Sequence, residues 1–147
     1  MTFYDEVGGY ETFERIVGVF YREVALDDEF RAMYPEEDLG PAAERLTLFL
    51  AQYWGGPTTY SEKRGHPRLR MRHVAYHIDP AARDRWLRHM RTAIDEVGLS
   101  PLHEATLWDY LERAAYAMVN TFEPAAAAPV GRPVLHARPR QDSPENT

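Results

Sequence analysis

The spacing of apolar side chains along the chain predicts amphipathic helices. The first is expected from about residue 10 to residue 26, because apolar positions recur there every three to four residues, as they do on one helical face. These positions are Phe13, Ile16, Val17, Phe20, Tyr21 and Val24. A helix with such a stripe buries it against other helices, so we expect a packed core around this segment.

Three further helices follow from the same spacing together with start and stop residues. The second is expected to begin at Pro41 and to end before Gly55, since proline suits a first helical turn and glycine a helix end. The third and fourth each begin with a capping residue and a proline, in the pairs Asp79-Pro80 and Ser100-Pro101. No segment shows the alternation of apolar and polar residues that a strand would have, so the sequence predicts an all-α fold.

The connection between the second and third helices stands apart from the rest of the chain. Residues 55 to 78 are basic and aromatic and are interrupted by glycine and proline, with one candidate short helix or turn around Arg68 to His73. A connection of this length in a compact domain is usually functional. We therefore expect the functional site beside it.

The C-terminal part differs in composition. From residue 124 onward the chain is rich in proline and alanine and contains almost no large apolar side chains. Such a segment buries too little apolar surface to offset the entropy of ordering it. We expect one folded domain over residues 1 to 123 and a disordered tail over residues 124 to 147.

Composition narrows the classes of protein that fit. The chain has 147 residues, 44% of them apolar, and no cysteine. This excludes disulfides, thiolate metal sites, a cysteine nucleophile and c-type haem attachment. The acidic first thirty residues resemble no secretory signal, and no apolar run is long enough to span a membrane, so we expect a soluble cytoplasmic protein.

Charge is unevenly distributed along the chain. Residues 1 to 62 carry 4 basic and 13 acidic side chains, whereas residues 63 to 91 carry 9 basic and 2 acidic ones. A short basic block in an acidic protein favours a local anionic partner such as a carboxylate or phosphate, and argues against nucleic acid, which needs a broader basic field. A solvated helix face explains the block equally well.

Six histidines are the candidate metal ligands: His66, His73, His77, His89, His103 and His136. His136 lies in the tail, and we expect His89 and His103 to be exposed surface residues. On a continuous helix, His73 and His77 would share one face, as a zinc pair requires. No glutamate follows the first of them as in zinc proteases, and a non-haem helical module that binds zinc or docks a partner remains an alternative.

The order of residues resembles the group II truncated haemoglobins, particularly their actinobacterial (O-type) branch. The resemblance is strongest in Tyr53-Trp54-Gly55-Gly56-Pro57, Thr59-Tyr60-Ser61-Glu62 and Arg64-Gly65-His66-Pro67-Arg68-Leu69-Arg70-Met71-Arg72-His73. It also covers Phe3-Tyr4-Asp5, Gly8-Gly9, Phe20-Tyr21 and Tyr34-Pro35, and continues from Trp86 to Phe122. It thus spans nearly all of residues 1 to 123.

This resemblance implies a truncated globin fold, a two-over-two helical sandwich around haem b. It assigns His73 as the proximal ligand of the haem iron, with the sixth coordination position open to a diatomic ligand. It places Tyr21, Tyr34 and Trp86 on the distal face, where hydrogen-bond donors hold a bound ligand. Ala42 falls where many globins have a distal histidine, and an alanine side chain cannot donate a hydrogen bond.

The resemblance also implies residues around the haem. Leu46 matches an apolar pocket position, and Phe49 and Leu50 are expected to line the haem or the route to it. The two haem propionates need partners, and Arg45, Tyr60 and Arg72 are the candidates, because arginine forms bidentate contacts with carboxylates.

The expected function is reversible binding of oxygen and of related ligands such as nitric oxide, carbon monoxide or peroxide. Conversion of nitric oxide to nitrate, or turnover of peroxide, is an extension of the resemblance. Either reaction needs electrons, and the chain has no glycine motif of a flavin or nicotinamide domain, so a separate reductase is expected. Oxygen storage or sensing without turnover uses the same residues, and the sequence leaves the oligomeric state open.

Overall fold

The computed structural model describes residues 1–73 and 76–121, and all regular secondary structure in these ranges is helical, as predicted. The helices are α1 (Phe3–Val7), α2 (Tyr10–Leu26), α3 (Asp28–Arg31), α4 (Gly40–Tyr53), α5 (Thr59–Arg64), α6 (Leu69–Arg72), α7 (Pro80–Val97) and α8 (Pro101–Met118). The predicted tail from residue 124 lies outside the described residues. Within those ranges, none of the helices has the length and apolar character needed to cross a membrane.

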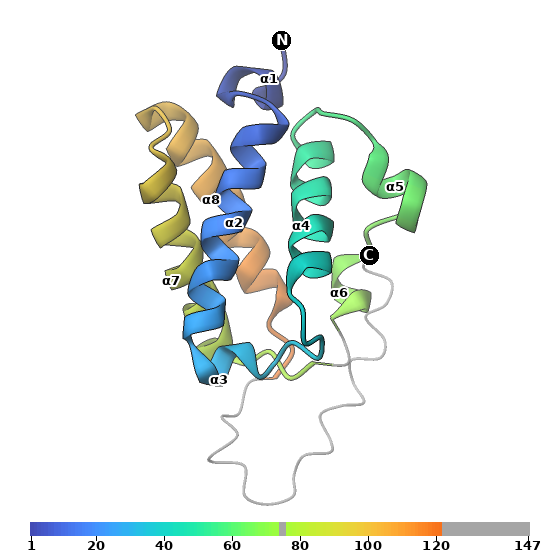
Figure 1. Cartoon of the computed structure of the whole chain (residues 1–147), viewed down its shortest axis with the longest axis vertical. Helices are drawn as coiled ribbons and strands as arrows, with labels where there is room; N and C mark the ends of the chain where they lie inside the picture. Colours follow the sequence, from blue (N-terminus) through green and yellow to red (C-terminus); the bar gives the residue numbers. More distant parts are fainter. Residues whose placement is uncertain (74–75, 122–147) are drawn as a thin grey trace, which may run out of the picture.

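The four long helices form the body of the molecule (Figure 1). Helix α2 packs against both α7 and α4, and α7 packs against α8. The apolar stripe predicted for α2 is buried, and Phe13, Phe20 and Val24 are completely inaccessible to solvent. The arrangement is the two-over-two helical sandwich of truncated globins.

Capping residues fix where the helices of the sandwich begin. The Asp79 carboxylate accepts a hydrogen bond from the Ala82 backbone N–H at 2.8 Å, which satisfies one of the free donors at the start of α7. Ser100 plays the same part at the start of α8. The predicted starts of these two helices are therefore confirmed.

The glycine pair after α4 is required by a close approach of two segments. Gly55 has a φ of 103°, and a Cβ atom at Gly56 would lie 2.6 Å from the ring of Tyr4. Only glycine allows the N-terminal helix α1 to lie against the end of α4, because it has no side chain and tolerates positive φ. This contact orients the chain as it enters the basic connection.

Three short helices were not predicted. Helix α3 begins where the Asp27 carboxylate accepts a hydrogen bond from the Phe30 N–H, and α1 begins with a capping box on Thr2. Helix α5 lies within the connection that the sequence predicted to be irregular. Helices of four to six residues carry too few apolar positions to show a period, and tertiary contacts decide whether they form.

Candidate functional site

A cavity of about 530 Å³ opens between α2, α4, α7, α8 and the connection that contains α5 and α6. This volume lies in the range of small-molecule and cofactor pockets. Every site residue predicted from the sequence lines it: Tyr21, Tyr34, Arg45, Leu46, Phe49, Leu50, Tyr60, Arg72, His73 and Trp86. These residues are far apart in the chain, and the fold brings all of them to one cavity.

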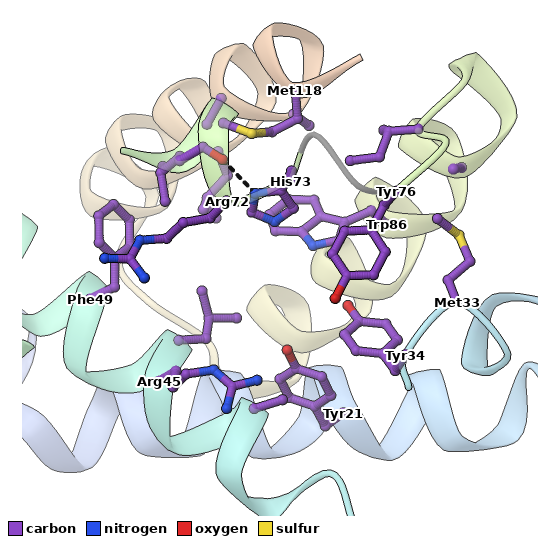
Figure 2. A pocket seen from close by; sticks show the side chains of 18 of the residues that line it. Tyr21, Met33, Tyr34, Arg45, Phe49, Arg72, His73, Tyr76, Trp86 and Met118 are labelled. Atoms are coloured by element: carbon purple, nitrogen blue, oxygen red, sulfur yellow. Dashed lines mark hydrogen bonds between the residues drawn. The ribbon is translucent and has the colours of Figure 1, made fainter. Parts of the chain in front are cut away.

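His73 follows the last residue of α6 and projects into the cavity (Figure 2). Its Nδ1 lies 2.7 Å from the carbonyl oxygen of Leu69. Because a carbonyl oxygen only accepts hydrogen bonds, Nδ1 is the donor, and in the neutral form of the ring Nε2 then has the lone pair. The backbone carbonyl of His73 accepts a hydrogen bond from the side-chain amide of Asn120, which lies after α8.

Arg72 stabilises the turn that carries His73. Its guanidinium donates hydrogen bonds to the backbone carbonyls of Pro67, Arg64 and His66, two of them at 2.8 and 2.9 Å. The carbon of the same guanidinium also lies 5.8 Å from the ring centroid of Tyr60, within the range of a cation–π contact. One side chain thus connects the end of α5, the loop after it and α6.

Tyr21 and Tyr34 lie together on the side of the cavity away from His73, whereas the indole of Trp86, which also lines the cavity, overlaps His73 in this view (Figure 2). The rings of Tyr21 and Tyr34 meet edge to face, with centroids 5.7 Å apart. Buried Phe20 supports this wall, since its ring centroid lies 4.9 Å from that of Tyr21 and 5.4 Å from that of Trp86. The two long helices α2 and α7 therefore hold Tyr21 and Trp86, and Tyr34 lies in the segment between α3 and α4.

Both phenols of this wall remain protonated at neutral pH. Burial raises the pKa of Tyr21 to about 12, although the contact with Tyr34 and the charge of Arg45 act to lower it. Burial raises the pKa of Tyr34 well above its ordinary value, and the neighbouring Tyr21 raises it further. Each hydroxyl therefore presents an O–H donor.

The remaining predicted residues form the rest of the wall. Leu50 and Tyr60 are buried, while Leu46 and Phe49 are half-buried. The guanidinium of Arg45 forms an ion pair with the Glu36 carboxylate at 2.7 Å, and that hydrogen bond lowers the pKa of Glu36. Arg45 is thus held at the cavity by an acidic partner that the sequence did not indicate.

The other histidines in the described ranges do not line the cavity. Helix α6 ends at Arg72 and α7 begins at Pro80, so His73 and His77 do not share a helix face. His77 is exposed. Within residues 1–73 and 76–121, no group of three or more His, Cys, Asp or Glu side chains that could hold a metal ion is present. The zinc pair considered from the sequence thus lacks its geometry.

The prediction that His89 is an exposed surface residue is wrong. His89 is only 7% exposed, and its Nε2 lies 2.8 Å from the Asp27 carboxylate. Its helix carries several arginines, and no local pattern of residues indicates that one face of this helix meets an acidic helix end. His103, also expected at the surface, is half-buried, and its Nε2 lies 3.1 Å from Glu6.

The cavity is also lined by residues that the sequence did not indicate as site residues, among them Met33, Tyr76, Tyr110 and Met118. Figure 2 shows the Tyr76 hydroxyl directed toward the same part of the cavity as those of Tyr21 and Tyr34. Tyr76 lies three residues after His73, which was the available indication that it faces the site. Tyr110 lies on α8 and could not be distinguished from core by spacing alone.

The side chains that line the cavity fit a haem group. A single imidazole with a free ring nitrogen is the protein ligand that haem iron takes in globins. Aromatic and aliphatic side chains cover most of the wall, which suits an apolar macrocycle. Arg45 and Arg72 supply positive charge for carboxylate groups at the cavity edge.

Comparison with known proteins identifies the family of the chain. The family model of the bacterial-like globins matches residues 2–120. A curated relative from Bacillus subtilis, described as group 2 truncated hemoglobin YjbI, is 39% identical over 118 residues, which are 80% of this chain and 89% of that protein. A group 2 truncated hemoglobin of Lotus japonicus is 34% identical over 118 residues, 78% of this chain and 70% of that protein.

Solved structures give the same result. A thermostable hemoglobin from the actinobacterium Thermobifida fusca superposes with a TM-score of 0.82 at 64% identity, covering 84% of this chain and all of that one. The group II truncated hemoglobin of Bacillus anthracis superposes with a TM-score of 0.80 at 34% identity, covering 87% of this chain and 98% of that one.

Fold, cavity and similarity define the class of this protein as a haem-binding, oxygen-binding globin with haem b as its cofactor. The chain belongs to the bacterial-like globin family and, within it, to the group II truncated haemoglobins.

Proposed function

We propose that His73 ligates the haem iron and that Tyr21, Tyr34 and Trp86 stabilise the ligand bound on the opposite side. We further propose that the protein converts nitric oxide and oxygen to nitrate, or reduces peroxide, with electrons from a separate reductase. The observation that carries the proposal is a single one: a histidine whose Nδ1 is hydrogen-bonded to a backbone carbonyl lines the same largely apolar cavity as Tyr21, Tyr34 and Trp86.

The proximal role follows from the hydrogen bond of His73. The Leu69 carbonyl fixes the tautomer and orientation of the ring, and such a partner makes the other nitrogen more basic. Nε2 is then the metal ligand. Arg72 acts as a positioning residue, because it holds the turn from which the ring projects.

The distal role follows from the protonation of the phenols. Haem iron supplies the position at which oxygen or another diatomic ligand binds. Electron density moves onto such a ligand, so donors in a water-poor pocket bind it more tightly than water would. Tyr21 and Tyr34 keep their protons because burial raises their pKa values, and the indole N–H of Trp86 is a donor at every pH.

For the anionic edge of the haem, we propose Arg45, Tyr60 and Arg72 as propionate partners. Arg72 has the most complete set of protein contacts, since three carbonyls accept hydrogen bonds from it. Arg45 must share its guanidinium with Glu36. We therefore expect Arg72 to position the propionate edge and Arg45 to contribute mainly charge.

The distal assignment is tested by stopped-flow measurement of oxygen dissociation in Tyr21→Phe, Tyr34→Phe and Trp86→Phe. Loss of one donor is expected to raise the dissociation rate by about tenfold, the equivalent of one net hydrogen bond to a charged acceptor. Tyr10→Phe is the matched control, because Tyr10 lies on the same helix as Tyr21 but does not line the cavity. Unchanged rates in all three distal variants would contradict the assignment.

Turnover is tested by mixing the oxygenated protein with nitric oxide, with and without a reducing system. Repeated fast formation of nitrate in the presence of reductant supports the dioxygenase function. A single slow oxidation would show instead that the protein stores or senses oxygen, a function that the same cavity serves.

A further inference from the structure

The connection between α4 and α7 carries a basic surface beside the cavity. Residues 63 to 72 have no acidic side chain, and their basic residues are Lys63, Arg64, Arg68, Arg70 and Arg72. All of these except Arg72 are exposed, and Met71 among them is 43% exposed. We name the outward part of this segment the basic face; it consists of Lys63, Arg64, Arg68, Arg70 and Met71.

Helix α6 separates the basic face from the cavity by a single helical turn. Leu69 and Arg72, which are three positions apart and so lie on one side of the helix, line the cavity. Arg70 and Met71, between them, are exposed and do not line it. A molecule bound to the basic face would therefore lie about 10 Å from the cavity, the width of one helix.

The charges of the basic face have little compensation within the protein. On helices α2, α4, α7 and α8, several arginines pair with carboxylates. Within residues 1–73 and 76–121, by contrast, Arg64, Arg68 and Arg70 form no ion pair, and Lys63 only approaches Glu44, at 3.9 Å. Like charges held close together repel each other unless a counter-charge is near, so the basic face favours an anionic partner.

Arg68 combines charge with apolar surface on the basic face. Its guanidinium lies 3.8 Å from the Met71 sulfur. Its φ of 41° is the only positive value of a non-glycine residue in the described part of the chain, and this conformation is disfavoured for residues with a side chain. Strain of this kind indicates a functional constraint, and arginine beside methionine is typical of protein–protein interfaces.

We propose that the basic face is the docking surface for a small acidic electron-transfer protein of the flavodoxin type, which carries a reduced flavin. The inference rests on the proposed function, in which a separate reductase supplies electrons. One electron leaves the partner's flavin, and the ferric haem iron gains it and becomes ferrous. No proton passes between the two proteins.

The charge of the rest of the chain restricts an acidic partner to this face. Residues 1 to 62 carry 4 basic and 13 acidic side chains, so they repel such a protein, whereas the basic face attracts it. The attraction speeds the encounter and orients the partner toward the cavity. A small protein touches only the basic face, whereas an extended anionic membrane would also meet the acidic segments, so a protein partner is favoured over lipid.

The test is stopped-flow reduction of the ferric, haem-loaded protein by fully reduced flavodoxin at about 0.02 M and about 0.2 M salt. For the wild type, the second-order rate constant should fall by about tenfold between these conditions, because salt screens the attraction. In Arg68→Glu/Arg70→Glu, the rate at low salt should fall by about tenfold and lose most of its salt dependence. A wild-type rate that does not depend on salt would overturn the docking surface.

Arg15→Glu/Arg88→Glu is the matched control, because it changes the net charge by the same amount. Arg15 on α2 and Arg88 on α7 are exposed and do not line the cavity. Helices α7 and α6 lie on opposite sides of the molecule (Figure 1). Equal slowing in the two double variants would show that net charge alone matters and would overturn the proposal.

Photoreduced lumiflavin provides a second control, since it is a small reductant without an acidic protein surface. It should reduce the wild type and both double variants at the same rate. Slower reduction of Arg68→Glu/Arg70→Glu by lumiflavin would place the defect in the haem site and would overturn the docking role.

Two further results separate this inference from its alternatives. A wild-type protein that binds no haem would overturn the proposed function and the docking surface together, whereas repeated nitrate formation with a chemical reductant but salt-independent reduction by flavodoxin would overturn the docking surface alone. Sedimentation with phosphatidylglycerol vesicles that is lost in Arg68→Glu/Arg70→Glu, without slower reduction by flavodoxin, would assign the basic face to a membrane instead.

Discussion

The two walls of the cavity are built in different ways. The distal wall lies on the long helices α2 and α7, where Phe20, with no solvent exposure, packs beneath Tyr21 and Trp86. The proximal wall lies on α6, a helix of four residues, none of them buried. It is held by hydrogen bonds from Arg72 to three carbonyls and from Asn120 to the carbonyl of His73.

The two walls therefore differ in what they contribute: the distal wall sets the shape of the cavity, and the proximal wall attaches the haem. The distal wall is part of the hydrophobic core, so it forms when the chain folds. A substitution in this wall therefore lowers the free energy of unfolding of the whole protein. The proximal wall depends on a few polar contacts to backbone, so it can loosen locally while the sandwich stays folded. We expect the proximal side to control how firmly haem is held and the distal side to control how strongly the bound ligand is stabilised.

The largest expected effect is on the core beneath the distal wall. Phe20→Ala should lower the free energy of unfolding by about 3–5 kcal/mol, because it removes a completely buried aromatic ring and leaves a cavity. Urea denaturation measures this change. Leu26→Ala, on the same helix but 75% exposed, is the control and should change stability little. Equal losses would contradict the assignment of the distal wall to the core.

On the proximal side, Arg72→Ala should increase the rate of haem loss by about tenfold, equivalent to about 1.4 kcal/mol, with little change in global unfolding. The reason is that the turn carrying His73 loses three hydrogen bonds. Transfer of haem to an apoglobin acceptor measures the rate. Arg72→Lys should behave like the alanine variant, because one ammonium cannot reproduce the planar fork.

Arg70→Ala provides the control for Arg72. Arg70 is exposed on the same helix and does not line the cavity. Its removal changes the net charge by the same amount. If both variants lost haem equally fast, general charge rather than the contacts of Arg72 would hold the proximal wall.

Asp27, whose carboxylate contacts His89, is expected to make the free energy of unfolding depend on pH. Burial alone would raise the pKa of Asp27, but hydrogen bonds from His89 and Phe30 and the charge of Arg85 outweigh it and lower the pKa. A lowered pKa contributes stability that is present above the ordinary value of about 3.9 and is lost as pH falls through the folded-state value. Asp27→Asn keeps a capping residue and should cost about 1 kcal/mol at neutral pH.

Urea denaturation at neutral and acidic pH checks this prediction. The wild type and Asp27→Asn should begin to converge as the pH falls through about 4 and should become equal only below the lowered folded-state pKa of Asp27, where the wild-type carboxylate is protonated too. Asp109→Asn is the control, because its ion pair with Arg113 is about two-thirds exposed on both sides and contributes little. A stability difference that stays constant with pH would contradict the role of the Asp27 charge.

The smallest expected effect is that of pH on the rate of oxygen dissociation. Because burial raises the pKa of Tyr21 to about 12, its hydroxyl stays a donor, and oxygen dissociation should be nearly constant between about pH 6 and about pH 11. Stopped-flow measurements across this range check the prediction. A rate that rises with a midpoint near the ordinary tyrosine pKa of about 10 would show that the phenol is exposed to water.

The parts of the molecule that could be predicted from the sequence are those marked by a local pattern of residues or by a long continuous motif. The stripe of α2 and the capping pairs at Asp79 and Ser100 are local features that the fold keeps, and the long motif ending at His73 pointed to the cavity. Helix α5 and the burial of His89 depend on tertiary contacts, which no spacing in the chain encodes. The stacking of Tyr53 on Tyr110 joins residues 57 positions apart, and nothing local indicates it.

The central claim, that His73 holds the haem iron, is tested most directly by the visible spectrum of His73→Gly reconstituted with hemin, with and without free imidazole. We predict that the variant loses the spectrum of a histidine-ligated haem and that added imidazole restores it, because the small ligand fills the space left by the side chain. His77→Gly, at an exposed position outside the cavity, should keep the wild-type spectrum. An unchanged axial-ligand spectrum in His73→Gly would contradict the account.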